Sequence, residues 1–162
     1  MQTNTLPHPD ELMRLMEAKL WPSSHEQAIQ QNLSRRISAS DVARMISGES
    51  QIFLHPNPRT TLADDYRASE QKLEGAGFFN AYREMLKQID PDRALFIADF
   101  GPGSDAPIAL DFRENQDDPP VIALQWNDHP GTNEKSRWVQ LAPSFSEFVK
   151  QLNLWSLPKF KR

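Results

Sequence analysis

The chain has no cysteine among its 162 residues, and this absence excludes two classes of protein. A scaffold held by disulfides and a zinc site built on thiolates both require cysteine. A basic excess is also lacking, because 18 Lys and Arg stand against 22 Asp and Glu, for a formal net charge of −4. Since general nucleic-acid binders carry a positive excess, we do not expect direct nucleic-acid binding.

Long apolar runs are missing as well. No stretch approaches the ~18 consecutive apolar residues of a membrane span, and the start at 1–5 has neither the basic nor the apolar region of a signal peptide. We therefore expect a cytoplasmic protein without a membrane partner. What the chain does have is 38% apolar residues and a length typical of one domain.

Helical spacing dominates the first half. Short helices are predicted after Pro9, from a capping box at Ser24, and from Ser38 or Ser40 to Gly48, and another helix follows Thr61. The strongest amphipathic helix is predicted over 78–89. We interpret its aromatic stripe as core packing rather than a ligand site; the stripe consists of Phe78, Phe79, Tyr82, Met85, Leu86 and Ile89.

The second half favours strands. Short apolar or alternating segments separated by polar turns predict strands at 94–98, 108–112, 121–126 and 137–141, followed by a helix capped by Ser144. The run 51–54 before two prolines predicts an edge strand. In 108–112 the alternation predicts one packed face and one solvated face. The predicted fold class is α+β, a twisted and mainly antiparallel sheet with a meander in the second half, flanked by helices.

An ordered set of motifs carries a family resemblance. The set comprises the run 95–101, the segment 104–111, Pro120-Val121, Trp126, Val139 and the "Ser-Phe-x-x-Phe" helix within 142–148. In this order the motifs resemble the SUKH superfamily, the proteins grouped around the yeast regulator Smi-one/Knr-four. The likeness covers about residues 93–153.

The resemblance implies a protein-binding domain without catalytic residues. On this basis we expect a SUKH-like domain over 41–153, with an N-terminal helical extension over 1–40 packed on it and a basic C-terminal tail over 154–162. Many bacterial members are immunity proteins, so the expected function is neutralisation of a toxin by direct binding. A regulatory scaffold of the Smi-one/Knr-four type is the alternative, and an uncharacterised hydrolase is a more remote one.

Motifs for catalysis are weak. Asp99-Phe100-Gly101 spells the magnesium-binding tripeptide of kinases, but no phosphate loop or His-Arg-Asp accompanies it. Ser104 lies among glycines, but a strand rather than a helix is predicted after it. The four histidines have no partner at helix-face spacing. We therefore expect no enzyme activity, no cofactor and no metal.

Acidic residues and two tryptophans are the candidate partner-binding residues. A meander would bring several of their loops to one end of the sheet, where they would attract a basic toxin domain such as a nuclease. Alternatively they form a solvated rim, with Asp99 and Asp111 fixing turns, and a calcium site is a third reading. The two tryptophan side chains either pack against the core or form the hot spot of a protein interface. The candidates are Asp99, Asp105, Asp111, Asp117, Asp118, Trp126, Asp128 and Trp138.

The last nine residues have the opposite charge, with three cations and no acidic residue. Such a tail either binds an acidic surface or a nucleic acid, or is a frayed terminus. For the whole protein we expect a monomer or a weak homodimer.

Overall fold

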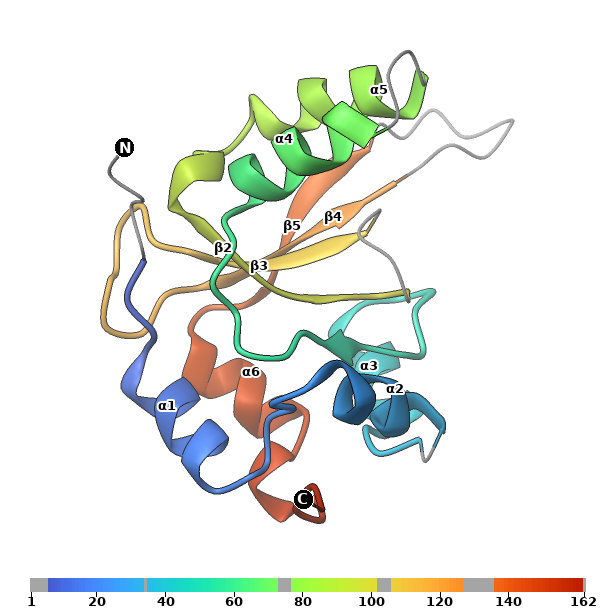
Figure 1. Ribbon diagram of the computed structural model, residues 1–162, viewed down its shortest axis with the longest axis vertical. Helices are drawn as coiled ribbons and strands as arrows, with labels where there is room; N and C mark the ends of the chain where they lie inside the picture. The colour runs from blue at the N-terminus through green and yellow to red at the C-terminus, as the bar shows by residue number, and fades with distance from the viewer. Residues whose placement is uncertain (1–5, 34, 73–76, 102–105, 127–135, 162) are drawn as a thin grey trace.

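A computed structural model describes residues 6–33, 35–72, 77–101, 106–126 and 136–161. Within these ranges the chain forms one five-stranded sheet in the order β1-β2-β3-β4-β5, and every neighbouring pair is antiparallel. The predicted α+β class and the antiparallel meander are confirmed (Figure 1). The strands are β1 (Phe53–Leu54), β2 (Ala94–Asp99), β3 (Pro107–Asp111), β4 (Val121–Gln125) and β5 (Arg137–Ala142).

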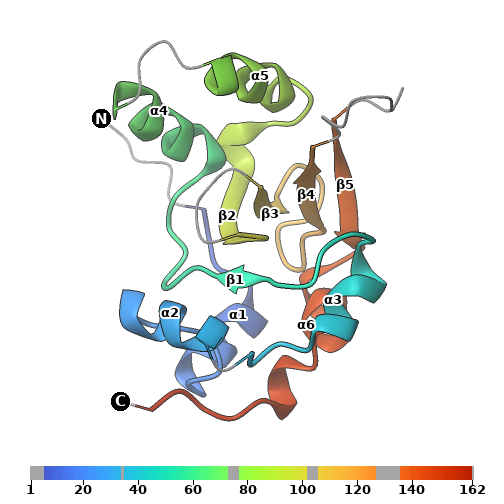
Figure 2. The same ribbon diagram turned by 90° about the vertical axis from the view of Figure 1, so that its right-hand side faces the viewer.

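Helices cover both faces of the sheet (Figures 1 and 2). On one face lie α4 (Leu62–Lys72) and α5 (Gly77–Leu86). The other face carries a larger group, namely α1 (Asp10–Glu17), α2 (His25–Leu33), α3 (Ala39–Met45) and α6 (Phe145–Gln151). Two short 3-10 helices, η1 (Pro91–Arg93) and η2 (Leu154–Ser156), precede β2 and follow α6. None of the described helices combines the length and apolar character needed to cross a membrane.

The two helical layers explain the sequence of β2. Leu95 and Ile97 belong to the core cluster shared with α1 and α6, whereas Ala94 and Phe96 belong to the cluster under α4 and α5. Because both faces are covered, all six residues of β2 are buried, and the first five of them form a continuous apolar run.

The alternation in 108–112 predicts one solvated face for the neighbouring strand, β3, and this prediction is wrong. In β3 all five residues are buried, and Ala109 packs into the α4–α5 cluster. The second helical layer covers this face, and a small alanine there gave no sequence signal of burial. The amphipathic helix predicted over 78–89 supplies part of that layer, since Tyr82, Met85 and Leu86 lie in the same cluster.

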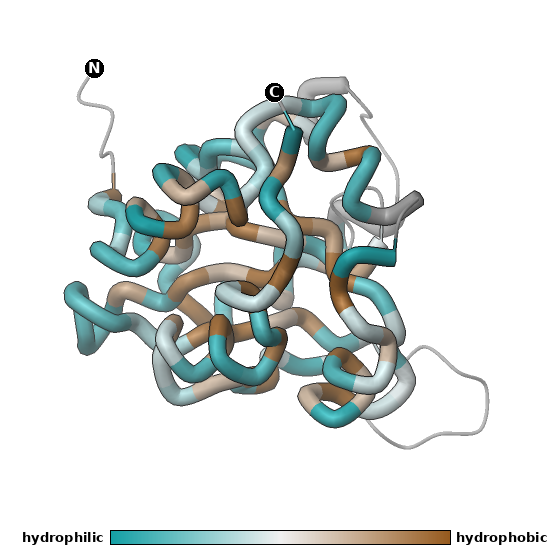
Figure 3. Tube along the Cα trace, turned by 90° about the horizontal axis from the view of Figure 1, so that it is seen from below, coloured by the Kyte–Doolittle hydropathy of each residue, from teal (hydrophilic) through white to brown (hydrophobic). Residues whose placement is uncertain are grey.

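Each of the three segments predicted from the sequence, 1–40, 41–153 and 154–162, contributes residues to the larger core cluster. Leu12 and Leu15 of α1 are fully buried in it, together with Leu154 of the C-terminal segment. Trp21 is also buried, its ring centroid lies 6.1 Å from that of Phe145, and its Nε1 donates a hydrogen bond to a backbone carbonyl of the β1 region. Hydrophobic and hydrophilic residues alternate along the helices of this layer, which Figure 3 views from below.

The two predicted capping serines accept the expected backbone hydrogen bonds. Ser24 Oγ accepts from Gln27 N at 3.1 Å, and Ser144 Oγ accepts from Glu147 N at 3.1 Å. Each bond satisfies one of the free N–H groups in the first turn of a helix. Gln27 Oε1 in turn accepts from Ser23 N, one residue before the position that the capping box predicts.

His55 is the described histidine with the most altered environment. Its ring stacks on Phe96 with centroids 4.1 Å apart, and burial lowers the pKa of His55 to about 4. The folded state therefore binds fewer protons than the unfolded chain between the folded pKa of about 4 and the ordinary value of 6.5. The contribution to stability is complete above the ordinary value and is lost as pH falls toward 4.

We predict that this titration removes about 3 kcal/mol of stability between pH 7 and pH 4. His55→Phe keeps an aromatic ring against Phe96 but cannot bind a proton, so the difference in unfolding free energy between the two proteins should change with pH by that amount. Urea denaturation at pH 7, 5.5 and 4 measures it. Equal losses of stability in the wild type and the variant would contradict the assignment.

Candidate binding surfaces

Asp99 holds the turn after β2. Its side chain is fully buried, Oδ1 accepts a hydrogen bond from Gly101 N at 2.7 Å, and Oδ2 accepts from Ala106 N at 3.1 Å. Both carboxylate oxygens thus bind backbone on either side of the β2–β3 connection. A buried side chain with this role is not available as a surface contact for a partner.

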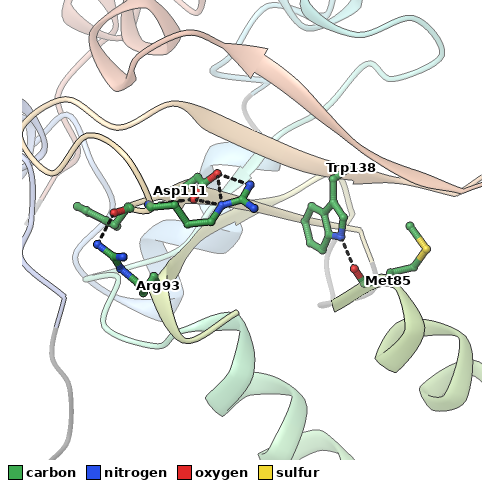
Figure 4. A network of polar contacts seen from close by, with 6 residues as sticks. Met85, Arg93, Asp111 and Trp138 are labelled. Atoms are coloured by element: carbon green, nitrogen blue, oxygen red, sulfur yellow. Dashed lines mark hydrogen bonds and ion pairs between the residues drawn. The ribbon is translucent and has the colours of Figure 1, made fainter. Parts of the chain in front are cut away.

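Asp111 holds the opposite turn, after β3. It is 7% exposed and pairs with Arg113, whose Nη2 lies 2.8 Å from Asp111 Oδ2 and whose backbone N donates to Asp111 Oδ1 (Figure 4). The hydrogen bond to Asp111 is the main reason that the pKa of Arg113 is raised. Nearby, Arg93 donates from Nη2 to the carbonyl of Phe112 at 2.9 Å, and Arg93 O accepts from Phe112 N. The start of the β3–β4 connection is therefore fixed on both sides.

The strand register places these two aspartates at opposite ends of the sheet. Asp99 pairs with Pro107 at the start of β3, whereas Asp111 pairs with Ala94 at the start of β2. The structure thus does not bring them together, as a single acidic patch would require. Asp105 and Asp128 lie outside the described residues.

Asp117 and Asp118 lie in the β3–β4 loop, and Asp117 is exposed. Asn115 Oδ1 accepts hydrogen bonds from the backbone N of both aspartates at 3.0 Å. Asp118 Oδ1 also accepts from Ser146 N at 3.0 Å, so this carboxylate caps the first turn of α6. Together with the exposed Glu114, these residues form a short acidic loop whose backbone is held by side-chain hydrogen bonds, which we call the acidic loop (Glu114 to Asp118).

The two candidate tryptophans are half-buried and face α5. Trp138 Nε1 donates to the carbonyl of Met85 at 2.7 Å, which fastens β5 to that helix (Figure 4). The ring of Trp126 lies 6.5 Å from that of Tyr82, and both tryptophans pack against the α4–α5 core cluster. Their contacts are those of packing residues, one of the two readings that the sequence left open.

A cleft between α2 and the C-terminal segment was missed by the sequence analysis. It has a volume of about 760 Å³, and its lining comes from one side of α2, the two arginines that follow that helix and residues 158–161. The charged side chains in its lining are Arg35, Arg36, Lys159, Lys161 and Glu26. The basic charge of the tail is evident from the sequence, but nothing in the sequence pairs it with two arginines more than 120 residues earlier. We call this feature the α2–tail cleft.

Within the described ranges no group of three or more His, Asp or Glu side chains is arranged to hold a metal ion. No family model, curated protein or solved structure matches the chain. The resemblance to the SUKH superfamily therefore stays a prediction.

Proposed function

We propose that this chain is a cytoplasmic protein-binding domain without catalytic activity, an immunity protein of the SUKH type that neutralises a toxin by covering it. The acidic loop is the observation that supports the proposal most directly. It presents Glu114 and Asp117 to solvent on a backbone that is already fixed by Asn115 and by the capping contact of Asp118. A loop ordered before binding loses little conformational entropy when a partner docks.

The charge of the loop favours a basic partner. Glu114, Asp117 and Asp118 belong to one connection. After the hydrogen bond to Asp111, the negative charges of Asp111, Glu114 and Asp90 also raise the pKa of Arg113. Negative groups gathered in this way accelerate encounter with a positively charged surface. A nuclease toxin fits this chemistry because its own site must hold phosphate.

Other conspicuous side chains already have structural partners. Asp99 and Asp111 accept hydrogen bonds from turn backbone, Trp138 donates to α5, and the half-buried His55 stacks on Phe96. These roles leave the exposed loop as the better candidate for a functional contact, and they favour recognition over catalysis.

Co-expression with the product of the neighbouring gene tests the immunity proposal. The expected result is protection of the host cell and a complex that co-purifies with this protein. Absence of both, or a neighbouring product with no toxicity, would contradict immunity.

Charge reversal in the acidic loop gives a quantitative prediction. Glu114→Lys with Asp117→Lys should slow association with the toxin at least tenfold at low salt and flatten its dependence on ionic strength, because steering is lost. Stopped-flow fluorescence measures the rate. Asp118 is left intact because it caps α6.

The matched control carries Glu17→Lys and Glu84→Lys, which change the net charge equally on α1 and α5. It should keep most of the wild-type rate. If both double variants slow association by the same factor, net charge rather than the loop directs binding.

A further inference from the structure

The α2–tail cleft gathers four cations, whereas Glu26 is the one acidic residue among its lining side chains. Arg35, Lys159 and Lys161 are exposed at its walls, and Arg36 is half-buried between them. In the described part of the chain none of these four forms an ion pair. In a protein with an excess of acidic residues overall, such a cluster is a local reversal of charge.

The guanidinium of Arg36 is partly desolvated in this cleft and forms no ion pair with the described residues. Among the described residues its guanidinium donates to neutral carbonyls, from Nε and Nη2 to Pro158 O at 3.2 and 3.1 Å and from Nη2 to Leu20 O at 2.9 Å. Its Nη1 is buried, and none of the described residues accepts a hydrogen bond from it. Burial lowers the pKa of Arg36 to about 10. A desolvated cation without a counter-charge is stabilised by any anion that enters the adjoining cleft.

The wall formed by the tail is fixed in place. Phe160 lies under the Arg36 guanidinium with 4.1 Å from Cζ to the ring centroid, and Phe160 N donates to Lys19 O at 2.8 Å. On the next residue, Lys161 O accepts from Gln27 Nε2 at 3.1 Å. These contacts hold the lysines on both sides of Phe160 at the edge of the cleft before any ligand binds.

The shape of the cleft favours an elongated ligand. Its lining runs along α2 from Ser24 to Gln31 and continues to the two arginines. The nine residues of α2 span about 13 Å, the length of roughly four residues of extended peptide. A second cavity of about 250 Å³ shares Gln31, Arg35 and Arg36 and continues toward Ile52.

We propose that the α2–tail cleft binds an extended acidic segment of a protein partner, whose carboxylates pair with Arg35, Lys159 and Lys161. Arg36 is the positioning residue, since it holds the tail against α2. This surface has the opposite charge to the acidic loop, so the proposal does not rest on the proposed function and either one can fail alone.

The test uses a fluorescein-labelled octapeptide of alternating Glu and Ser and the full-length protein. Fluorescence anisotropy should show binding that weakens with added salt, and an alternating Lys and Ser peptide should not bind. Arg35→Gln, Lys159→Gln and Lys161→Gln together should weaken binding at least tenfold. All three side chains are exposed, and circular dichroism checks that the variant is folded.

The control variant neutralises three exposed cations elsewhere, with Arg14→Gln, Lys87→Gln and Lys150→Gln. Its affinity for the acidic peptide should stay within twofold of the wild type. Equal losses in the two triple variants, or no binding of the acidic peptide, would overturn the proposal.

Sodium tripolyphosphate and an eight-residue oligothymidylate are tested as competitors. Competition by either at a tenfold lower concentration than the unlabelled acidic peptide would assign the cleft to a phosphate ligand and overturn the proposal as well.

Discussion

Trp21→Ala is expected to lower the free energy of unfolding by about 3–5 kcal/mol, the range for removing a large buried aromatic side chain. Trp21 is 1% exposed, packs against Phe145 of α6 and donates a hydrogen bond to His55 O at 2.7 Å. Because small domains are stable by only about 5–15 kcal/mol, the variant should be partly unfolded at moderate urea concentrations. Equilibrium urea denaturation measures the loss.

Trp21→Phe is the matched control. It keeps a ring beside Phe145 but removes the donor to His55 O, so we expect a loss of about 1–2 kcal/mol. A loss below about 1 kcal/mol for Trp21→Ala would contradict the account, in which residues before 40 are part of the core.

Asp99→Ala is expected to lower the free energy of unfolding by about 2–4 kcal/mol, because two backbone N–H groups lose a charged acceptor. Those groups are Gly101 N and Ala106 N, at 2.7 and 3.1 Å from the carboxylate. Their amide hydrogen exchange, followed by NMR, should accelerate more than that of amides elsewhere in the sheet.

Asp99→Asn separates hydrogen bonding from charge. The amide oxygen can accept from one of the two N–H groups, but the amide nitrogen cannot accept from the other, so an intermediate loss is expected. If Asp99→Ala left stability and exchange unchanged but weakened binding of the toxin, Asp99 would be a partner contact and the turn assignment would be wrong.

The strands and helices could be predicted because their patterns are local. The apolar run 94–98 and the stripe that includes Tyr82 and Met85 both occupy the core, and the polar turns between strands favour a meander. The capping serines were equally predictable, since Ser24 and Ser144 bond groups only three residues away.

The second covered face of the sheet was harder to predict. Ala109 is too small to indicate burial, and Asp111 looks like a solvated residue until its pairing with Arg113 is known. Periodicity describes one strand at a time, whereas burial depends on the layer of helices packed above it.

The candidate site depended on contacts between distant segments. The role of Asp99 required the register between β2 and β3, and the α2–tail cleft required residues 35–36 and 158–161 to meet. Sequence reasoning could identify Asp117 as a loop residue, but not the hydrogen bonds from Asn115 that fix this loop.

Amide hydrogen–deuterium exchange of the free protein and of its complex with the neighbouring toxin tests the central proposal most directly. In the free protein the amides of Asp117 and Asp118 should exchange slowly for an exposed loop, because Asn115 accepts from both. In the complex we predict further protection of residues 113–118. Unchanged exchange in this loop, with protection confined to α4 and α5, would contradict binding through the acidic loop.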